Sequence, residues 1–268
     1  MFKITQQWIA PQWEDALKKA DLLNIEALTT REFDWFEEPN RRRGGWSGVT
    51  RIVLNPEAAP QDQRAVFLKI QQNHFYRAPS TCFLKRLSFA REFDALQALS
   101  PQIQCMPNLL LFAKWKHNGN QGSLIVTEAL EGFEPFDQWL KKQKALVDSD
   151  QSDSILKALQ SIADATRELH HAGWAHFGLY PKHTFIRKNR CGGYTTCLID
   201  LEKARRPLFS FQSTIEDVSR FLRKSKQLND QEKIEYLRTY FQTDTFSVAQ
   251  QRLIHRMHGG PPFEFNDR

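Results

Sequence analysis

The sequence predicts an α+β fold in which a strand-rich half precedes a helix-rich half. Before residue 130, four runs are rich in β-branched and aromatic residues: 44–54, 65–70, 108–115 and 122–128. After residue 130, apolar residues recur mainly at helical spacing. The sequence has no internal repeat, so we expect one domain with two lobes, residues 1–130 and 131–268, connected near 128–136.

In the first half, turn residues separate the expected strands. Gly44 and Gly45 precede the first strand, and Asn55–Gln63, with two prolines and an aspartate, predicts a loop. His117–Asn120 predicts the turn of a hairpin between the last two strands. One helix is expected over 89–99, because its apolar residues share a face: Phe89, Phe93, Leu96 and Leu99.

The second half is expected to be largely helical. Phe136–Leu146 and Ser154–His171 have helical spacing, and Gly173 ends the second of these helices. Two further helices are expected around Glu216–Lys224 and Gln231–Phe241. A short hairpin lies before them, and its second strand contains the apolar run Thr196–Ile199.

The bulk properties fit an ordinary globular protein. The chain has 268 residues, of which 41% are hydrophobic and 25% charged, and it is long enough to bury a substantial core. No stretch approaches the roughly 18 apolar residues of a membrane span. The segment Met1–Trp8 lacks the pattern of a signal peptide. We therefore expect a cytoplasmic protein.

The formal net charge of +6 favours anionic partners without naming one. Arg41–Arg43 is the densest basic run, and it is either a solvated turn or a contact for phosphate or anionic lipid. The four cysteines, Cys82, Cys105, Cys191 and Cys197, show no zinc-site spacing. Cys191 and Cys197 flank a Gly-Gly turn and would face each other in one arrangement of the hairpin, but free thiols are the expected state in a cytoplasmic protein.

The first half contains, in order, the residue types that hold nucleotide phosphates in phosphoryl transfer. Gly45, Ser47 and Gly48 lie in a glycine turn that precedes a strand, and glycines let backbone amides approach phosphate oxygens. Lys69 lies among apolar residues of the returning strand, where a charge needs a partner, and Glu92 on the following helix supplies one. Each signal has a plain alternative: a turn, an edge-strand lysine and a surface glutamate. Their order favours the functional interpretation.

The connector and the second half supply further parts. The apolar strand that ends at Glu128 and Leu130 is a candidate for backbone contact with adenine, although a buried strand reaching the surface has the same letters. Asp200 ends another apolar strand, where a carboxylate is either functional, as a metal ligand, or the cap of a turn. His183 is the second candidate metal ligand, although Mg²⁺ prefers oxygen, and its alternative role is a hydrogen bond to a phosphate or to Asp200.

The loop before these residues carries the expected catalytic positions His176, Gly178 and His183, together with Asp200 beyond it. In protein kinases the pattern His-Arg-Asp places the catalytic base at its third position, and a metal-binding Asn follows in the same loop. Here the triplet is His176-Phe177-Gly178, and His183, seven residues after His176, takes the place of the Asn. The layout indicates a kinase-like active site in which glycine replaces the base.

These motifs resemble the lipopolysaccharide-core sugar kinases of the InaA/WaaP type, a branch of the protein-kinase-like superfamily. The resemblance runs from about Gly44 to Phe241 and is most specific in Tyr180–Phe185 and Leu198–Arg205. It implies a protein-kinase-like bilobal fold and transfer of the γ-phosphoryl group of ATP to a heptose or related sugar of the core. ATP and Mg²⁺ are the implied cofactors. The implied partner is lipopolysaccharide core or another anionic glycolipid, with peripheral contact at the inner face of the inner membrane and no nucleic acid.

By the same resemblance, Lys69 grips the phosphates, Glu92 pairs with Lys69, Asp200 holds Mg²⁺ and Asp217 braces the catalytic loop. Gly178 departs from the pattern, since the heptose kinases have Asp at this position. Two functions therefore stay open: a kinase that works without this base, and a pseudokinase that binds nucleotide or glycolipid without transfer. A small-molecule phosphotransferase of the aminoglycoside type ranks last, because it keeps an Asp in this loop.

Overall fold

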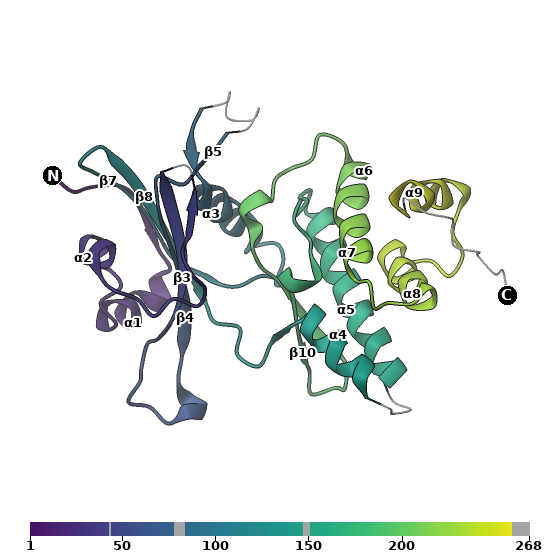
Figure 1. Ribbon diagram of the computed structural model, residues 1–268. Helices are drawn as coiled ribbons and strands as arrows, with labels where there is room; N and C mark the ends of the chain where they lie inside the picture. Colours follow the sequence, from purple (N-terminus) through teal and green to yellow (C-terminus); the bar gives the residue numbers. More distant parts are fainter. Residues whose placement is uncertain (43, 78–83, 147–150, 259–268) are drawn as a thin grey trace. The chain divides into compact units, whose positions relative to one another are not determined.

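The computed structural model describes residues 1–42, 44–77, 84–146 and 151–258. The chain folds into two compact units. One comprises residues 1–100 and 107–131, and the other comprises residues 101–106 and the chain from residue 132 onward. The first unit is built on a β-sheet and the second mostly on helices (Figure 1). The predicted α+β class, strand-rich and then helix-rich, is confirmed.

A six-stranded antiparallel sheet forms the first unit, with the strand order β1-β7-β8-β4-β3-β2. Its strands are β1 (Lys3–Ile9), β2 (Asn40–Arg42), β3 (Gly45–Val53), β4 (Ala65–Gln72), β7 (Leu109–His117) and β8 (Asn120–Glu128). The four predicted strands are all present, and the two strands that the sequence pattern does not predict, β1 and β2, lie at the edges. A short ladder joins β5 (Phe75–Tyr76) to β6 (Arg86–Leu87).

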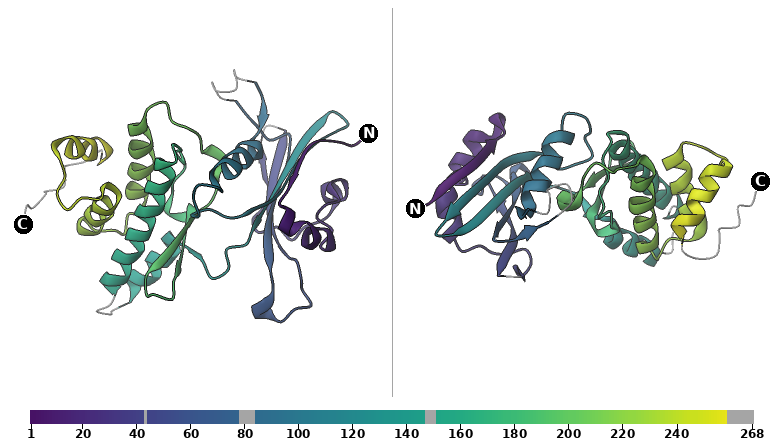
Figure 2. Two further views of the ribbon diagram at one scale, coloured as in Figure 1. Left: turned by 180° about the vertical axis from the view of Figure 1, so that it is seen from behind. Right: turned by 90° about the horizontal axis from the view of Figure 1, so that it is seen from above.

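Helices cover both faces of this sheet (Figures 1 and 2). The helices α1 (Glu14–Lys19) and α2 (Ile25–Thr30) lie on one face, after a 3₁₀ turn, η1 (Pro11–Trp13), and α3 (Ser88–Leu99) lies on the other. Side chains alternate along a strand, so β4 serves both faces. Leu68 and Ile70 join the core beneath α1 and α2, whereas Lys69 is directed toward α3. The predicted loop over 55–63 contains one 3₁₀ turn, η2 (Pro60–Asp62).

In the second unit, α5 (Gln151–His171) packs against α8 (Asp230–Phe241) and against the hairpin of β10 (Thr184–Lys188) and β11 (Tyr194–Leu198) (Figures 1 and 2). The order β11-β10-β9 completes a small sheet with β9 (Glu134–Pro135). The other elements are α4 (Phe136–Ala145), η4 (Pro181–His183), η5 (Leu201–Lys203), α6 (Ser210–Ser213), η6 (Thr214–Val218), α7 (Ser219–Lys224) and α9 (Val248–His258). Across the described ranges, no helix is long and apolar enough to cross a membrane.

Two features of this unit differ from the sequence prediction. The helix expected over 216–224 begins earlier, with α6, and its middle part, η6, is π-helical. Such turns often occur at functional sites. The helix α9 is not predicted by the sequence pattern at all. Gly173 follows α5 with φ +78°, and its left-handed backbone ends that helix as predicted.

Three of the four cysteines lie within the described residues, and these three are free thiols: Cys105, Cys191 and Cys197. Cys197 is opposite Phe185 in the β10–β11 ladder, so it does not face Cys191. Burial raises the pKa of Cys105 to about 12 and also raises the pKa of Cys197. Cys82 lies outside the described residues.

We expect Cys191 to react much faster with a thiol reagent at pH 8 than Cys105 or Cys197. Its side chain is exposed, whereas the two buried thiols have raised pKa values and carry almost no thiolate at that pH. The reaction is best followed in a Cys82→Ser background, where one fast thiol is expected and Cys191→Ser should remove it. A fast phase that survives Cys191→Ser would contradict the burial of the other two.

Candidate active site

The charged residues predicted to hold phosphate form an ion pair in the first unit. Nζ of Lys69 lies 2.6 Å from Oε1 of Glu92, and their side chains are 18% and 4% exposed. Lys69 is in the middle of β4, with Val49 of β3 and Ile125 of β8 as its ladder partners. Both strands fix its backbone, and Glu92 fixes its ammonium group. A pair this buried is costly to desolvate, so removing either partner is expected to be unfavourable.

The predicted glycines lie inside β3 instead of in a loop before it. A side chain at Gly45 would collide with the backbone of Asn73, and one at Gly48 would collide with the ring of Trp35. Internal packing therefore accounts for glycine at both positions. The turn before the strand contains Gly44, whose φ is +77°. Ser47 lies between Gly45 and Gly48 in β3 and is half-buried. A phosphate contact along this strand stays a prediction.

Glu128 ends β8 and is tied to the start of β7. Its Oε2 accepts a hydrogen bond from Nδ2 of Asn108 at 2.8 Å, and its amide donates to the Asn108 carbonyl at 2.9 Å. The amide of Ala129 donates to the carbonyl of Ala65 at 3.0 Å. These bonds occupy two backbone donors of the predicted connector. Leu130, the next residue, is half-buried.

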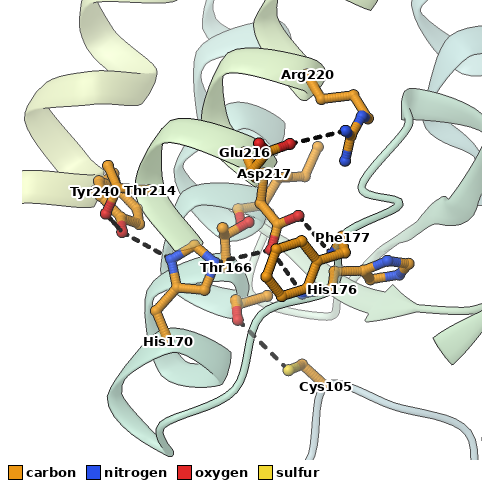
Figure 3. A network of polar contacts seen from close by, with 12 residues as sticks. Cys105, Thr166, His170, His176, Phe177, Thr214, Glu216, Asp217, Arg220 and Tyr240 are labelled. Carbon is orange, nitrogen blue, oxygen red and sulfur yellow. Dashed lines mark hydrogen bonds and ion pairs between the residues drawn. The ribbon is translucent and has the colours of Figure 1, made fainter. Parts of the chain in front are cut away.

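In the second unit, Asp217 holds the loop that carries the predicted catalytic positions (Figure 3). Asp217 is completely buried. Its Oδ2 accepts a hydrogen bond from the amide of His176 at 2.6 Å, and its Oδ1 accepts one from the amide of Phe177 at 2.8 Å. Phe177 has the left-handed φ of +53°, and the guanidinium of Arg205 lies 3.4 Å from its ring centroid. Asp217 therefore stabilises a backbone conformation that a bulky residue rarely adopts.

A chain of polar side chains positions Asp217 in turn (Figure 3). Nε2 of His170 lies 3.1 Å from Oδ2 of Asp217, and Nδ1 lies 2.7 Å from the Tyr240 hydroxyl, which is 2.8 Å from Oγ1 of Thr214. Burial raises the pKa of Tyr240 to about 12, so its hydroxyl stays protonated and can donate to His170. The carboxylate of Asp217 can only accept, so the proton between it and His170 belongs to Nε2 of His170. The π-helical turn η6 contributes both Thr214 and Asp217.

His176 is buried beside Gly178. Its Nε2 lies 2.9 Å from the carbonyl of Ile199, and burial lowers its pKa. The neutral ring therefore donates from Nε2 and keeps a lone pair on Nδ1, which has no hydrogen-bond partner within the described part of the chain. A Cβ at Gly178 would lie 3.4 Å from this Nδ1 and 3.7 Å from Cδ of Lys203. The backbone at residue 178 thus has room for a side chain.

His183 and Asp200 face each other across the end of the hairpin. Nδ1 of His183 lies 3.0 Å from the carbonyl of Gly178, and Nε2 lies 3.4 Å from Oδ2 of Asp200. Burial lowers the pKa of His183, so the neutral ring donates from Nδ1 and directs the lone pair of Nε2 toward the carboxylate. Two acceptors in this arrangement attract a cation. Asp200 itself has the left-handed φ of +62° and a side chain that is 38% exposed.

The Asp200 carboxylate fits a divalent ion that takes its other ligands from phosphate and water, as Mg²⁺ commonly does, whereas Nε2 of His183 is a poor ligand for Mg²⁺, because that ion prefers oxygen. The described residues contain no cluster of three or more His, Cys, Asp or Glu side chains suited to a metal. The predicted site residues thus fall into two groups. Gly45, Ser47, Gly48, Lys69, Glu92, Glu128 and Leu130 belong to the first unit, and His176, Gly178, His183 and Asp200 belong to the second.

Comparisons with known proteins identify the fold and the family of the chain. The protein InaA of Escherichia coli (strain K12) is 28% identical over 178 residues, which cover 66% of this chain and 76% of InaA. A solved structure, WaaP in complex with acyl carrier protein, is similar with a TM-score of 0.60 and 16% identity, over 89% of each chain. At that identity the likeness shows the fold alone, which is kinase-like.

The family comparison covers most of the chain. A model of the lipopolysaccharide kinase (Kdo/WaaP) family matches residues 26–240. The matched range begins in α2, ends in α8 and includes every residue of both groups described above. The chain therefore belongs to the lipopolysaccharide kinase (Kdo/WaaP) family.

Proposed function

We propose that this protein transfers the γ-phosphoryl group of ATP to a heptose or related sugar of the lipopolysaccharide core. The buried Lys69–Glu92 pair carries the proposal. Desolvating both charges is unfavourable, and apolar residues in their place would stabilise the sheet and α3 at least as well. Its presence in a member of this family supports a role in binding phosphate. The proposal includes a cytoplasmic location, peripheral at the inner face of the inner membrane, where the acceptor is reached.

The predicted residues of the first unit have distinct parts in this proposal. Lys69 neutralises charge on the phosphates, and Glu92 keeps its ammonium in position. The backbone of Gly45, Ser47 and Gly48 lies along the phosphates. The adenine contact involves Leu130, because the amides of Glu128 and Ala129 already donate within the unit.

Asp200 and His183 hold the divalent ion in this proposal. The ion, when bound, neutralises charge that develops on the transferring group. His183 also keeps the catalytic loop closed through its bond to the carbonyl of Gly178, at 3.0 Å. Asp217 fixes the same loop by accepting hydrogen bonds from the amides of His176 and Phe177. The acceptor hydroxyl would be oriented by this loop.

Glycine at position 178 makes a slow enzyme the expected result. A general base contributes about 10²–10⁴-fold to a rate. Phosphoryl transfer has a loose transition state, so positioning and charge neutralisation supply most of its catalysis. Transfer without the base is therefore consistent with the chemistry, and the pseudokinase alternative rests on Gly178 alone.

We expect Gly178→Asp to raise the transfer rate by about 10–100-fold, because it restores a base in the loop. The substitution fits: φ at Gly178 is not among the positive values, and a Cβ there would have contacts of 3.4 Å or more. Gly178→Asn is the matched control, since it has the same size but cannot accept a proton. Equal rates for Gly178→Asp and the unmodified protein, with both folded, would mean that the loop is not arranged for catalysis as proposed.

The deciding experiment is transfer of labelled γ-phosphate from ATP and Mg²⁺ to purified lipopolysaccharide core. Asp200→Asn is the control, since it keeps the size of the side chain and removes its charge. Label on the core that is lost with Asp200→Asn would support the proposal. Nucleotide binding without any transfer would favour the pseudokinase instead.

A further inference from the structure

Three large apolar side chains are exposed where the chain enters α6 and in its first turn; Figure 1 shows where this segment lies. Leu208 is 88% exposed, Phe209 is 59% exposed and Phe211 is 50% exposed. The two phenylalanine rings stack on each other, with their centroids 5.6 Å apart. Large apolar side chains exposed side by side mark an interaction surface. We call Leu208, Phe209 and Phe211 the apolar turn.

The apolar turn is held in shape at both ends. Oε1 of Gln212 accepts hydrogen bonds from the amides of Leu208, at 3.1 Å, and Phe209, at 3.3 Å. Upstream, Arg205 and Ala175 exchange two backbone hydrogen bonds of 2.9 and 3.0 Å. The three apolar side chains therefore project from a preformed turn. A preformed surface loses little conformational freedom when it binds.

Cations precede the apolar turn. Lys203, Arg205 and Arg206 are exposed, and the stretch 203–211 contains no acidic residue. The guanidinium of Arg206 lies 5.9 Å from the centroid of the Trp174 ring, and that of Arg205 lies on Phe177 of the catalytic loop. Exposed apolar side chains next to cations in the chain are typical of proteins that bind the surface of an anionic bilayer.

We propose that the apolar turn docks this protein on an anionic lipid bilayer. Leu208, Phe209 and Phe211 enter the boundary between headgroups and acyl chains, and Arg205 and Arg206 bind the lipid phosphates. The proposal rests on the proposed function, because a glycolipid acceptor lies in a bilayer. The guanidinium of Arg205 lies 3.4 Å from the centroid of the Phe177 ring, so docking at the apolar turn brings lipid headgroups next to the catalytic loop.

The shape of the surface favours a bilayer over an acidic protein. Exposure is greatest for Leu208, at the start of the turn, which projects 88% of its surface into solvent. A stable protein interface buries about 800 Å² on each side around a close-packed centre. Three projecting apolar side chains, with Arg205 and Arg206 next to them in the chain, suit insertion between lipid headgroups better than packing against a folded protein surface.

The test is sedimentation of the protein with lipid vesicles, without nucleotide. Binding is expected to vesicles that contain phosphatidylglycerol and to be at least tenfold weaker with phosphatidylcholine alone. The double substitution Leu208→Ser with Phe209→Ser is expected to weaken binding about 100-fold, because each side chain contributes roughly a factor of ten or more. Arg206→Gln is expected to weaken it about fivefold. Val248→Ser, at a residue that is 64% exposed on α9, is the matched control and should bind like the unmodified protein.

Three results would overturn the proposal: no binding to the anionic vesicles, equal binding to both vesicle types, or unchanged binding by the double variant. Loss of binding to an acidic protein in the double variant, without any vesicle binding, would assign the surface to a protein partner and reject the bilayer. The proposed catalytic function is tested apart from this one, by transfer to lipid-free core oligosaccharide. Failure of transfer to the oligosaccharide would not change the result with vesicles, and failure to bind vesicles would not change the result of the transfer assay.

Discussion

Asp217→Ala is expected to lower the free energy of unfolding by about 3–5 kcal/mol. The carboxylate is completely buried and accepts two short backbone hydrogen bonds, from His176 and Phe177, besides the bond from His170. Removing it leaves these donors without an acceptor in the interior. The left-handed conformation of Phe177 would also lose its main support.

Urea unfolding followed by circular dichroism measures this effect. Glu216→Ala is the control, because Glu216 precedes Asp217, is 47% exposed and makes a surface ion pair with Arg220. It should change the free energy of unfolding by at most about 1 kcal/mol. Asp217→Asn keeps one side-chain oxygen as an acceptor, so its effect on the free energy of unfolding should lie between the effects of Asp217→Ala and Glu216→Ala. A change below about 1 kcal/mol for Asp217→Ala would show that the loop does not depend on this carboxylate.

Lys69→Met is expected to reduce phosphoryl transfer by about 10²–10³-fold, the effect of removing one preorganised charged contact to a transition state. Lys69 lies at the centre of β4 and its ammonium is held by Glu92 at 2.6 Å, so the charge is already in place before nucleotide binds. Lys69→Arg keeps the charge but changes its shape, and an intermediate rate is expected. Lys116→Met, at an exposed strand lysine of β7, is the matched control.

The effect on transfer has to be separated from an effect on folding. Glu92 is 4% exposed, and its carboxylate is less well compensated when Lys69 is replaced. The rate is therefore divided by the folded fraction measured under the assay conditions. Unchanged transfer in folded Lys69→Met would remove Lys69 from the proposed site.

The local parts of the fold were predictable from the sequence. The alternation of β4 places Lys69 on the face opposite Leu68 and Ile70, whereas the contact of Lys69 with Glu92 was expected only from the order of glycine turn, strand and helix. The strand before Asp200, which ends at Leu198, and the loop with His183 are also local patterns. In these cases a few neighbouring residues determine both the element and the direction of the side chain.

Contacts between distant segments were not predictable in this way. His170 meets Asp217 and Tyr240 across 47 and 70 residues of chain, and a histidine at the end of an amphipathic helix gives no sign of such partners. The strand β1 pairs with β7 but is mostly exposed, so it lacks the alternation that identifies a strand. The π-helical turn η6, which contains Thr214 and Asp217, has no sequence signature of its own.

Leu201 determines how much freedom the turn at Asp200 has. It is completely buried, and its carbonyl accepts a hydrogen bond of 2.9 Å from the amide of Ala204. Glu202 follows where kinases have a flexible glycine. Rotating Asp200 outward would expose Leu201, at a cost of about 1.5–3 kcal/mol. We therefore expect the outward turn to be about 10–150-fold less populated than the buried one, so that, under the proposed function, this turn gives little regulation.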